Sequence, residues 1–122
     1  MRRVLIVGRD VLLREMMASL LADMPMEMHI VSSVADVEKR CWAGYYDLVV
    51  MLDLSHFFDG SAPIALLRPS GLSFPKFFVI SWQHSERNVM GLLECGVTQY
   101  LTLPVNIRRL RRKICESLNG TH

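Results

Sequence analysis

The 122-residue sequence has few cysteines and no long apolar run. Its three cysteines, Cys41, Cys95 and Cys115, are odd in number and widely spaced, so the sequence indicates neither a disulfide framework nor a CxxC metal site. The apolar runs 4–7 and 48–52 have the length of strands and fall far short of the roughly 20 residues that a membrane-spanning helix needs. We therefore expect a protein of the reducing cytoplasm with no membrane span.

An excess of charge of one sign is also missing. Lys and Arg total 14 against 12 Asp and Glu, a formal net charge of +2 that is too small for the domain as a whole to bind nucleic acid. Gly8 does not begin a GxGxxG fingerprint, and the histidines show no metal-ligand spacing. We expect no cofactor, no metal site and no enzymatic activity.

What the sequence does have is a regular alternation of short apolar runs with stretches of helical period, which is typical of strands joined by helical crossovers in a parallel sheet. Run 48–52 is continuously apolar, which favours a central strand covered on both faces. Asp10 and Asn106 can cap the first and last helices, and the first helix should bury a broad stripe that includes Leu12. The expected strands are 3–7, 29–31, 48–52, 77–81 and 99–102, and the expected helices are 11–22, 33–42 (or from 32), 62–67, 86–95 and 107 onward.

Two stretches of the chain resemble the receiver domain of bacterial response regulators. Residues 46–54, YDLVVMLDL, with Asp59 and Gly60 beyond them, are similar to the strand and loop around the phosphoacceptor of that family. Residues 92–104, LLECGVTQYLTLP, are similar to the family's run E-A-G-A-x-x-Y-L-x-K-P. The resemblance implies a doubly wound, five-stranded parallel sheet of the flavodoxin-like (βα)5 kind, in three α/β/α layers. It also implies one domain over residues 1–122, the N-terminal domain of a longer regulator.

The resemblance further implies a degenerate phosphorylation site. The family needs an acidic pair after the first strand to hold Mg²⁺, whose preferred ligands are hard oxygens, but Gly8 and Arg9 match those positions. Leu103 stands where the family has a Lys that contacts the phosphoryl oxygens. Ser81 matches the Ser or Thr that contacts the phosphoryl group, and Tyr100 matches the aromatic switch residue. The sequence is therefore that of a pseudo-receiver.

The phosphoacceptor position itself is left open between two neighbouring residues. An alignment of 46–60 without a gap places Leu52 there, where phosphoryl chemistry is impossible, whereas a slip of one residue places Asp53 there. In the second case, Arg9 is expected to pair with the Asp53 carboxylate and fill the place of Mg²⁺. Trp82 is expected to cover part of the pocket mouth.

The cations concentrate in the last expected helix, where 108–113 holds five of the 14 Lys and Arg residues. In the family, the fourth helix, the fifth strand and the fifth helix form a frequent dimerisation surface. Three residues are therefore candidates for the dimer face, pairing with Glu86 or Glu94 of a second copy: Arg108, Arg111 and Arg112. A solvated face and a contact with nucleic acid are the alternatives.

Together these features predict a cytoplasmic, phosphorylation-independent receiver-like domain in a two-component system. It would act by protein contacts and homodimerisation, and would reach DNA only through a separate effector domain in transcription control. One alternative is a true phosphoacceptor that takes a phosphoryl group from a histidine kinase onto Asp53. Another is a small-ligand-binding domain that uses Ser81, Trp82 and Arg9 at the carboxyl ends of the strands.

Overall fold

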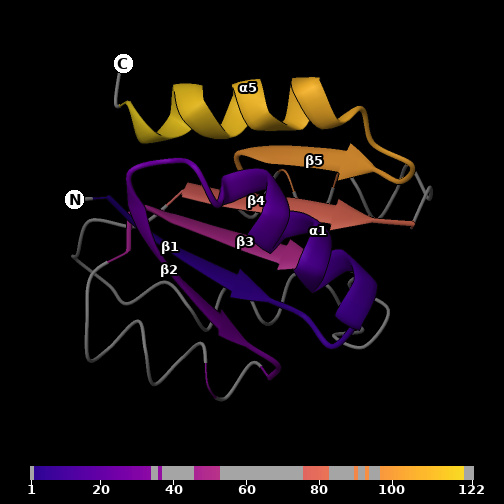
Figure 1. Cartoon of the computed structure of the whole chain (residues 1–122). Coiled ribbons are helices and arrows are strands. Elements are labelled where there is room, and N and C mark those ends of the chain that lie inside the picture. Colours follow the sequence, from indigo (N-terminus) through magenta and orange to yellow (C-terminus); the bar gives the residue numbers. More distant parts are fainter. Residues whose placement is uncertain are drawn as a thin grey trace, which may run out of the picture.

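The five described strands form one parallel sheet. The computed structural model describes residues 2–33, 36, 46–52, 76–82, 90, 93 and 97–119. The sheet has the strand order β2-β1-β3-β4-β5, which confirms the predicted doubly wound topology (Figure 1). The described elements are β1 (Arg2–Val7), α1 (Val11–Leu21), β2 (Met26–Val31), β3 (Leu48–Leu52), β4 (Lys76–Ser81), β5 (Gln99–Thr102) and α5 (Ile107–Leu118). The helices expected at 33–42, 62–67 and 86–95 lie mostly outside the described residues.

Helices α1 and α5 cover the same face of the sheet. Their buried side chains belong to one core cluster with alternate residues of the strands, including Ile6, Val50 and Ile80. The intervening strand residues, such as Leu5, Val49 and Val79, form a second cluster on the opposite face. Strand β3 is buried along its whole length, which confirms that it is the central strand with both faces covered. Neither described helix is long and apolar enough to cross a membrane.

Both described helices begin at the predicted caps. The Asp10 carboxylate accepts a hydrogen bond from the backbone N–H of Leu13 at 3.0 Å. The Asn106 side-chain oxygen accepts one from the backbone N–H of Arg109, also at 3.0 Å. Each cap satisfies an amide of the first turn that has no partner within its helix. These caps place both helix N-termini at the carboxyl edge of the sheet, where the predicted site lies.

Strand β2 is twice as long as the sequence predicted. It pairs with β1 in parallel from Arg2↔Met26 to Val7↔Val31, whereas the expected strand covered only 29–31. Met and Glu have weaker strand preferences than β-branched residues, so local sequence gives little sign of a strand before His29. Pairing with the buried strand β1 stabilises residues 26–28 as a strand, although their local preference for this structure is weak.

The prediction that Leu12 belongs to the buried apolar stripe of α1 is wrong. Leu12 is 78% exposed, and the neighbouring Val11 is 62% exposed. Leu13, Met17 and the Leu20–Leu21 pair are the buried side chains of this helix. The helix contains more apolar side chains than one face can hold, so the packing against the sheet, and not the composition, decides which of them are buried.

Candidate functional site

The predicted site lies where four strands end at the carboxyl edge of the sheet. Gly8 follows β1, Leu52 ends β3, Ser81 ends β4 and Leu103 follows β5. The strands are parallel, so these ends lie along one edge, on the side to which the arrows point (Figure 1). Gly8 is buried, and Leu52, Ser81 and Leu103 are 1%, 1% and 5% exposed. The edge is therefore closed to solvent at each of these positions.

Gly8 and Leu52 approach each other closely across β1 and β3. The register pairs Val7 with Met51, which brings the next residues, Gly8 and Leu52, side by side. A Cβ atom on residue 8 would lie 2.8 Å from the Leu52 Cβ and 3.4 Å from both its Cδ1 and its carbonyl oxygen. Real Cβ atoms essentially never come so close to another side-chain carbon. An aspartate, or any other residue with a Cβ, at position 8 would therefore require residue 8 or Leu52 to shift.

The side chains of Leu52 and Leu103 belong to the hydrophobic core. Both lie in the cluster that packs beneath α1 and α5, together with Ile6 and Ile80. Leu103 follows β5 at the position that matches the family's Lys, and its peptide bond to Pro104 is cis. Aliphatic side chains offer no ligand to an anion, and an ion placed among them would lose its hydration without compensation.

The two retained residues of the resemblance, Ser81 and Tyr100, lie on neighbouring strands. Ser81 is buried at the end of β4, and its carbonyl oxygen accepts a hydrogen bond from the Leu103 backbone N–H at 2.9 Å. Tyr100 is half-buried and packs against the core cluster on the face opposite α1. Strand pairing places Tyr100 beside Val79, two residues before Ser81. Both residues make further interactions.

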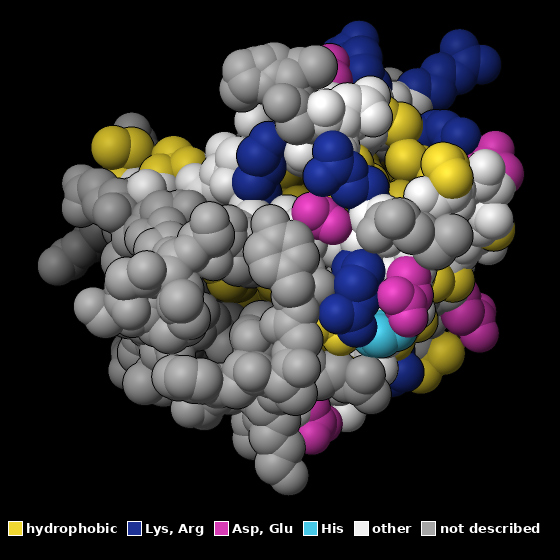
Figure 2. Space-filling model, turned by 90° about the vertical axis from the view of Figure 1, so that its left-hand side faces the viewer, with side chains coloured by type: hydrophobic (Ala, Val, Ile, Leu, Met, Phe, Trp, Pro, Cys, Tyr) yellow, Lys and Arg dark blue, Asp and Glu magenta, His cyan; other side chains and the backbone are white. Residues whose placement is uncertain are grey.

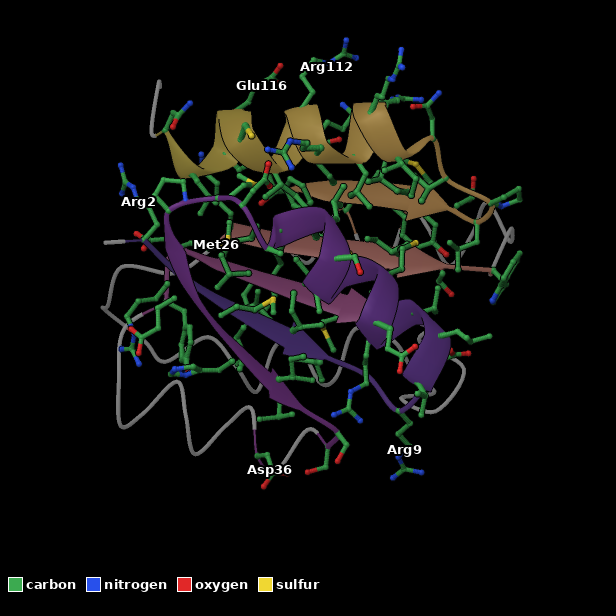
Figure 3. The ribbon with its side chains drawn as sticks, viewed as in Figure 1. Arg2, Arg9, Met26, Asp36, Arg112 and Glu116 are labelled. Carbon is green, nitrogen blue, oxygen red and sulfur yellow. The ribbon has the colours of Figure 1, made fainter. Side chains whose placement is uncertain are left out.

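The other candidates of this edge are exposed or lie outside the described residues. Asp53 is not among the residues that the structure describes, so its pairing with Arg9 stays a prediction. Arg9 is exposed, forms no ion pair with any described residue, and points outward beyond the start of α1 (Figure 3). Trp82 is 54% exposed after the end of β4, and its covering of the pocket mouth stays a prediction. No group of three His, Cys, Asp or Glu side chains in the described part of the chain is placed to hold a metal ion.

One of the dimer-face candidates, Arg111, makes its contacts within the chain. Its guanidinium donates to the two carboxylate oxygens of Asp23 at 2.7 and 3.1 Å and to the carbonyl oxygen of Leu20 at 2.8 Å. The hydrogen bond from Arg111 lowers the pKa of Asp23, and the same bond raises the pKa of Arg111. Arg111 therefore joins α5 to the C-terminal end of α1, whereas Arg108 and Arg112 remain exposed.

A polar cluster that the sequence did not predict lies near the amino ends of β1, β2 and β3. The hydroxyl of Tyr46, a residue only 3% exposed, lies 2.7 Å from Nδ1 of His29. Nε2 of His29 lies 3.1 Å from a Glu27 carboxylate oxygen, and Nε of Arg3 donates to the other oxygen at 3.1 Å. The Arg3 guanidinium also lies over the Tyr46 ring, 4.8 Å from its centroid. The four side chains thus form a closed ring of contacts.

The protonation states in this polar cluster follow from its hydrogen bonds. The bond from His29, followed by the charge of Arg3, lowers the pKa of Glu27, so this side chain is a carboxylate at neutral pH. A carboxylate only accepts hydrogen bonds, which places a proton on Nε2 of His29. In the neutral ring, Nδ1 then accepts from the Tyr46 hydroxyl. Only the pairing of β1 with β2 brings Arg3 beside Glu27, so no local pattern reveals the cluster.

Comparison with known proteins identifies the fold. No family model and no curated protein matches the sequence. A two-component response regulator from Clostridium difficile matches the structure with a TM-score of 0.87 and 16% identity, over 100% of this chain and 99% of that one. The receiver domain of the sensor histidine kinase PA1611 from Pseudomonas aeruginosa, with magnesium in its active-site cleft, gives 0.81 and 14%, over 98% of each chain. HP1043, an orphan response regulator of H. pylori, gives 0.81 and 20%, over 96% of each. This chain therefore has the fold of a response-regulator receiver domain.

Proposed function

We propose that the chain is a signalling domain of the receiver kind whose site does not carry a phosphoryl group. The close contact between Gly8 and Leu52 is the observation that carries this proposal. It supports assigning Leu52, rather than Asp53, to the acceptor position, because Leu52 is the last residue of β3 and lies beside the position of the missing acidic pair. A leucine side chain has no nucleophile.

The surroundings of Leu52 support the same proposal. Phosphoryl transfer is catalysed by positioned cations that neutralise the charge of the transferred group. Magnesium ligands are missing at Gly8 and Arg9, and the neutral Leu103 replaces the Lys. One neighbour in fold holds magnesium in its active-site cleft. Here, Leu52 and Leu103 present packed aliphatic side chains at the corresponding edge, so we infer that the domain transmits its signal through contacts with other proteins.

An NMR titration of the ¹⁵N-labelled domain tests the proposal. We expect the amide signals of Leu52, Ser81 and Tyr100 to stay unchanged on addition of Mg²⁺ and then of beryllofluoride, a mimic of the phosphoryl group. The Asp53→Asn variant is the matched control, because it removes the alternative acceptor without changing the size of the side chain. Shifts that centre on this edge and disappear in Asp53→Asn would establish Asp53 as the acceptor and overturn the proposal.

The proposal also includes homodimerisation of the domain and its action through a separate effector domain. The fold resembles that of regulators that act as parts of signalling systems, which supports a role in which the domain contacts other copies of itself. Sedimentation equilibrium over a range of protein concentrations measures whether the domain dimerises. A monomer at all concentrations would remove dimerisation from the proposal and leave other proteins as the partners.

A further inference from the structure

The charge of the chain is divided unequally between α5 and the rest. Helix α5 contains five Lys and Arg residues and one Glu, a net charge of +4. The whole chain has 14 cations and 12 anions, so nine cations and eleven anions lie elsewhere, with a net charge of −2. The helix is therefore a basic element on a slightly acidic domain. Figure 2 shows Lys and Arg side chains gathered along the upper part of the molecule, where α5 lies.

Two contacts and a buried apolar stripe fix α5 to the domain. Arg111 bonds to Asp23 and to the Leu20 carbonyl oxygen at the end of α1. At the other end of α5, the Lys76 ammonium group donates to the Ser117 carbonyl oxygen at 3.1 Å. Along the helix, three side chains are buried in the core: Leu110, Ile114 and Leu118. The outward face of α5 is thus presented on a rigid support.

Three arginines form a row on this outward face, which we call the arginine row: Arg108, Arg109 and Arg112. All three are exposed. Residues three and four apart are neighbours on a helix surface, with Cβ atoms about 5–6 Å from each other, so Arg112 lies beside both of the others. Arg108 and Arg109 form no ion pair with any described residue, and Arg112 has only the exposed Glu116 at 4.0 Å. Figure 3 shows Arg112 pointing away from the domain.

We propose that the arginine row binds the phosphate backbone of a nucleic acid. A guanidinium donates two parallel hydrogen bonds to a phosphate, and it is more weakly hydrated than an ammonium group. The row contains only arginines, and the only ion pair that it makes with a described residue is the exposed one between Arg112 and Glu116 at 4.0 Å. Contacts of this kind position a protein on a duplex without reading its sequence.

The composition of the outward face favours a nucleic acid over a protein partner. Its exposed residues are all polar: Arg108, Arg109, Arg112, Glu116 and Asn119. Ile107, 45% exposed at the start of the helix, lies on the face of the buried Leu110 and Ile114. Protein interfaces have an apolar centre, which this face lacks, whereas interfaces with nucleic acid are polar and cationic. A two-fold contact between two copies of the row would also place the same arginines against each other.

The arginine row is separate from the carboxyl-edge site, so its binding does not depend on whether Asp53 is phosphorylated. Fluorescence anisotropy of the whole chain with a short labelled DNA duplex, measured over a series of salt concentrations, tests the proposal. Three phosphate contacts predict that log K falls with log salt with a slope of about −2.7, and each single change of a row arginine to Gln should reduce the slope by about 0.9. Two duplexes of unrelated sequence should bind equally.

Matched variants distinguish DNA binding by the arginine row from a general effect of the positive charge of the chain. Arg14→Gln makes the same charge change on α1 and should leave the slope unchanged. The triple change of the row to Gln should abolish binding, and the triple change to Lys should keep the slope while weakening binding, because the forked contact is lost. Circular dichroism checks that each variant is folded, and the Lys variant keeps the proposal testable if the Gln variant unfolds.

Three outcomes would overturn the proposal. The first is no binding to either duplex at low salt. The second is binding that the triple Gln variant retains. The third is evidence that the row binds protein. Tighter binding to a poly-glutamate peptide of the same charge as the duplex would make the row a surface for an acidic protein. Loss of self-association in the triple variant, without DNA binding by the parent, would make it a surface for a second copy.

Discussion

Gly8 and Leu52 lie so close across β1 and β3 that a Cβ on Gly8 would be 2.8 Å from the Leu52 Cβ. The Gly8→Ala substitution should therefore overpack this edge and lower the free energy of unfolding by about 1–3 kcal/mol. Leu52→Ala alone should cost about 2–5 kcal/mol through the cavity that it leaves. Urea denaturation of the two single variants measures these costs.

The double variant shows whether the two positions compete for the same space. The double variant therefore uses Leu52→Gly, which removes the Cβ that would lie 2.8 Å from a Cβ on residue 8. Gly8→Ala should then cost less stability in the Leu52→Gly background than in the parent chain. Full additivity, or an unchanged stability in Gly8→Ala, would contradict the packing described for this edge.

The hydrogen bond between Tyr46 and His29 should contribute measurably to stability. Tyr46→Phe removes the hydroxyl from a side chain that is 3% exposed, and we expect the free energy of unfolding to fall by about 1 kcal/mol. The loss should be much smaller in a His29→Ala background, where the partner is already missing. Equal losses in both backgrounds, measured by urea denaturation, would show that the hydroxyl does not act through His29.

The ion pair between Arg111 and Asp23 predicts a dependence of stability on pH. Because the pKa of Asp23 is lower in the folded chain than its ordinary value of 3.8, the pair stabilises the fold fully above that value. The stabilisation is lost as the pH falls below 3.8 and through the lowered pKa. Asp23→Asn should therefore reduce the melting temperature at neutral pH and have progressively less effect in acid.

The Arg111→Gln substitution tests whether this pH effect comes from the ion pair with Asp23. In an Arg111→Gln background, Asp23→Asn should have little effect at any pH, because the cation that lowers the pKa is missing. Melting temperatures of the four proteins between neutral and acidic pH provide the comparison. The same acid-dependent loss in both backgrounds would assign the effect to another partner of Asp23.

The Asn106 cap should stabilise α5 and so support the arginine row. Asn106→Ala leaves the Arg109 amide without its partner, and we expect a cost of about 0.5–2 kcal/mol. Asn106→Asp is the matched control, because a carboxylate accepts the same hydrogen bond and is favoured at a helix N-terminus. Chemical denaturation followed by circular dichroism measures both, and equal destabilisation by Ala and Asp would show that the cap contributes nothing.

Much of the fold could be predicted from the sequence because its signals are local. The bounds of β3 and β5 agree with the predicted ranges, since a continuous apolar run and a short strand before a turn are visible along the chain. Asp10 and Asn106 were predicted as caps because a cap bonds to an amide only three residues away. The candidate site followed from a resemblance, and Asp53 stays a prediction.

The sequence by itself determined the order of the elements, the helix starts and the position of the basic helix, because each depends on residues close together in the chain. The tertiary structure decided the length of β2, the exposure of Leu12, the inward contact of Arg111 and the closeness of Gly8 to Leu52. Each of these depends on residues far apart in sequence whose distance is fixed only when strands pair and helices pack. Pairing of β1 with β3 places Gly8 against Leu52, and the distance between them cannot be inferred from the sequence pattern of either strand.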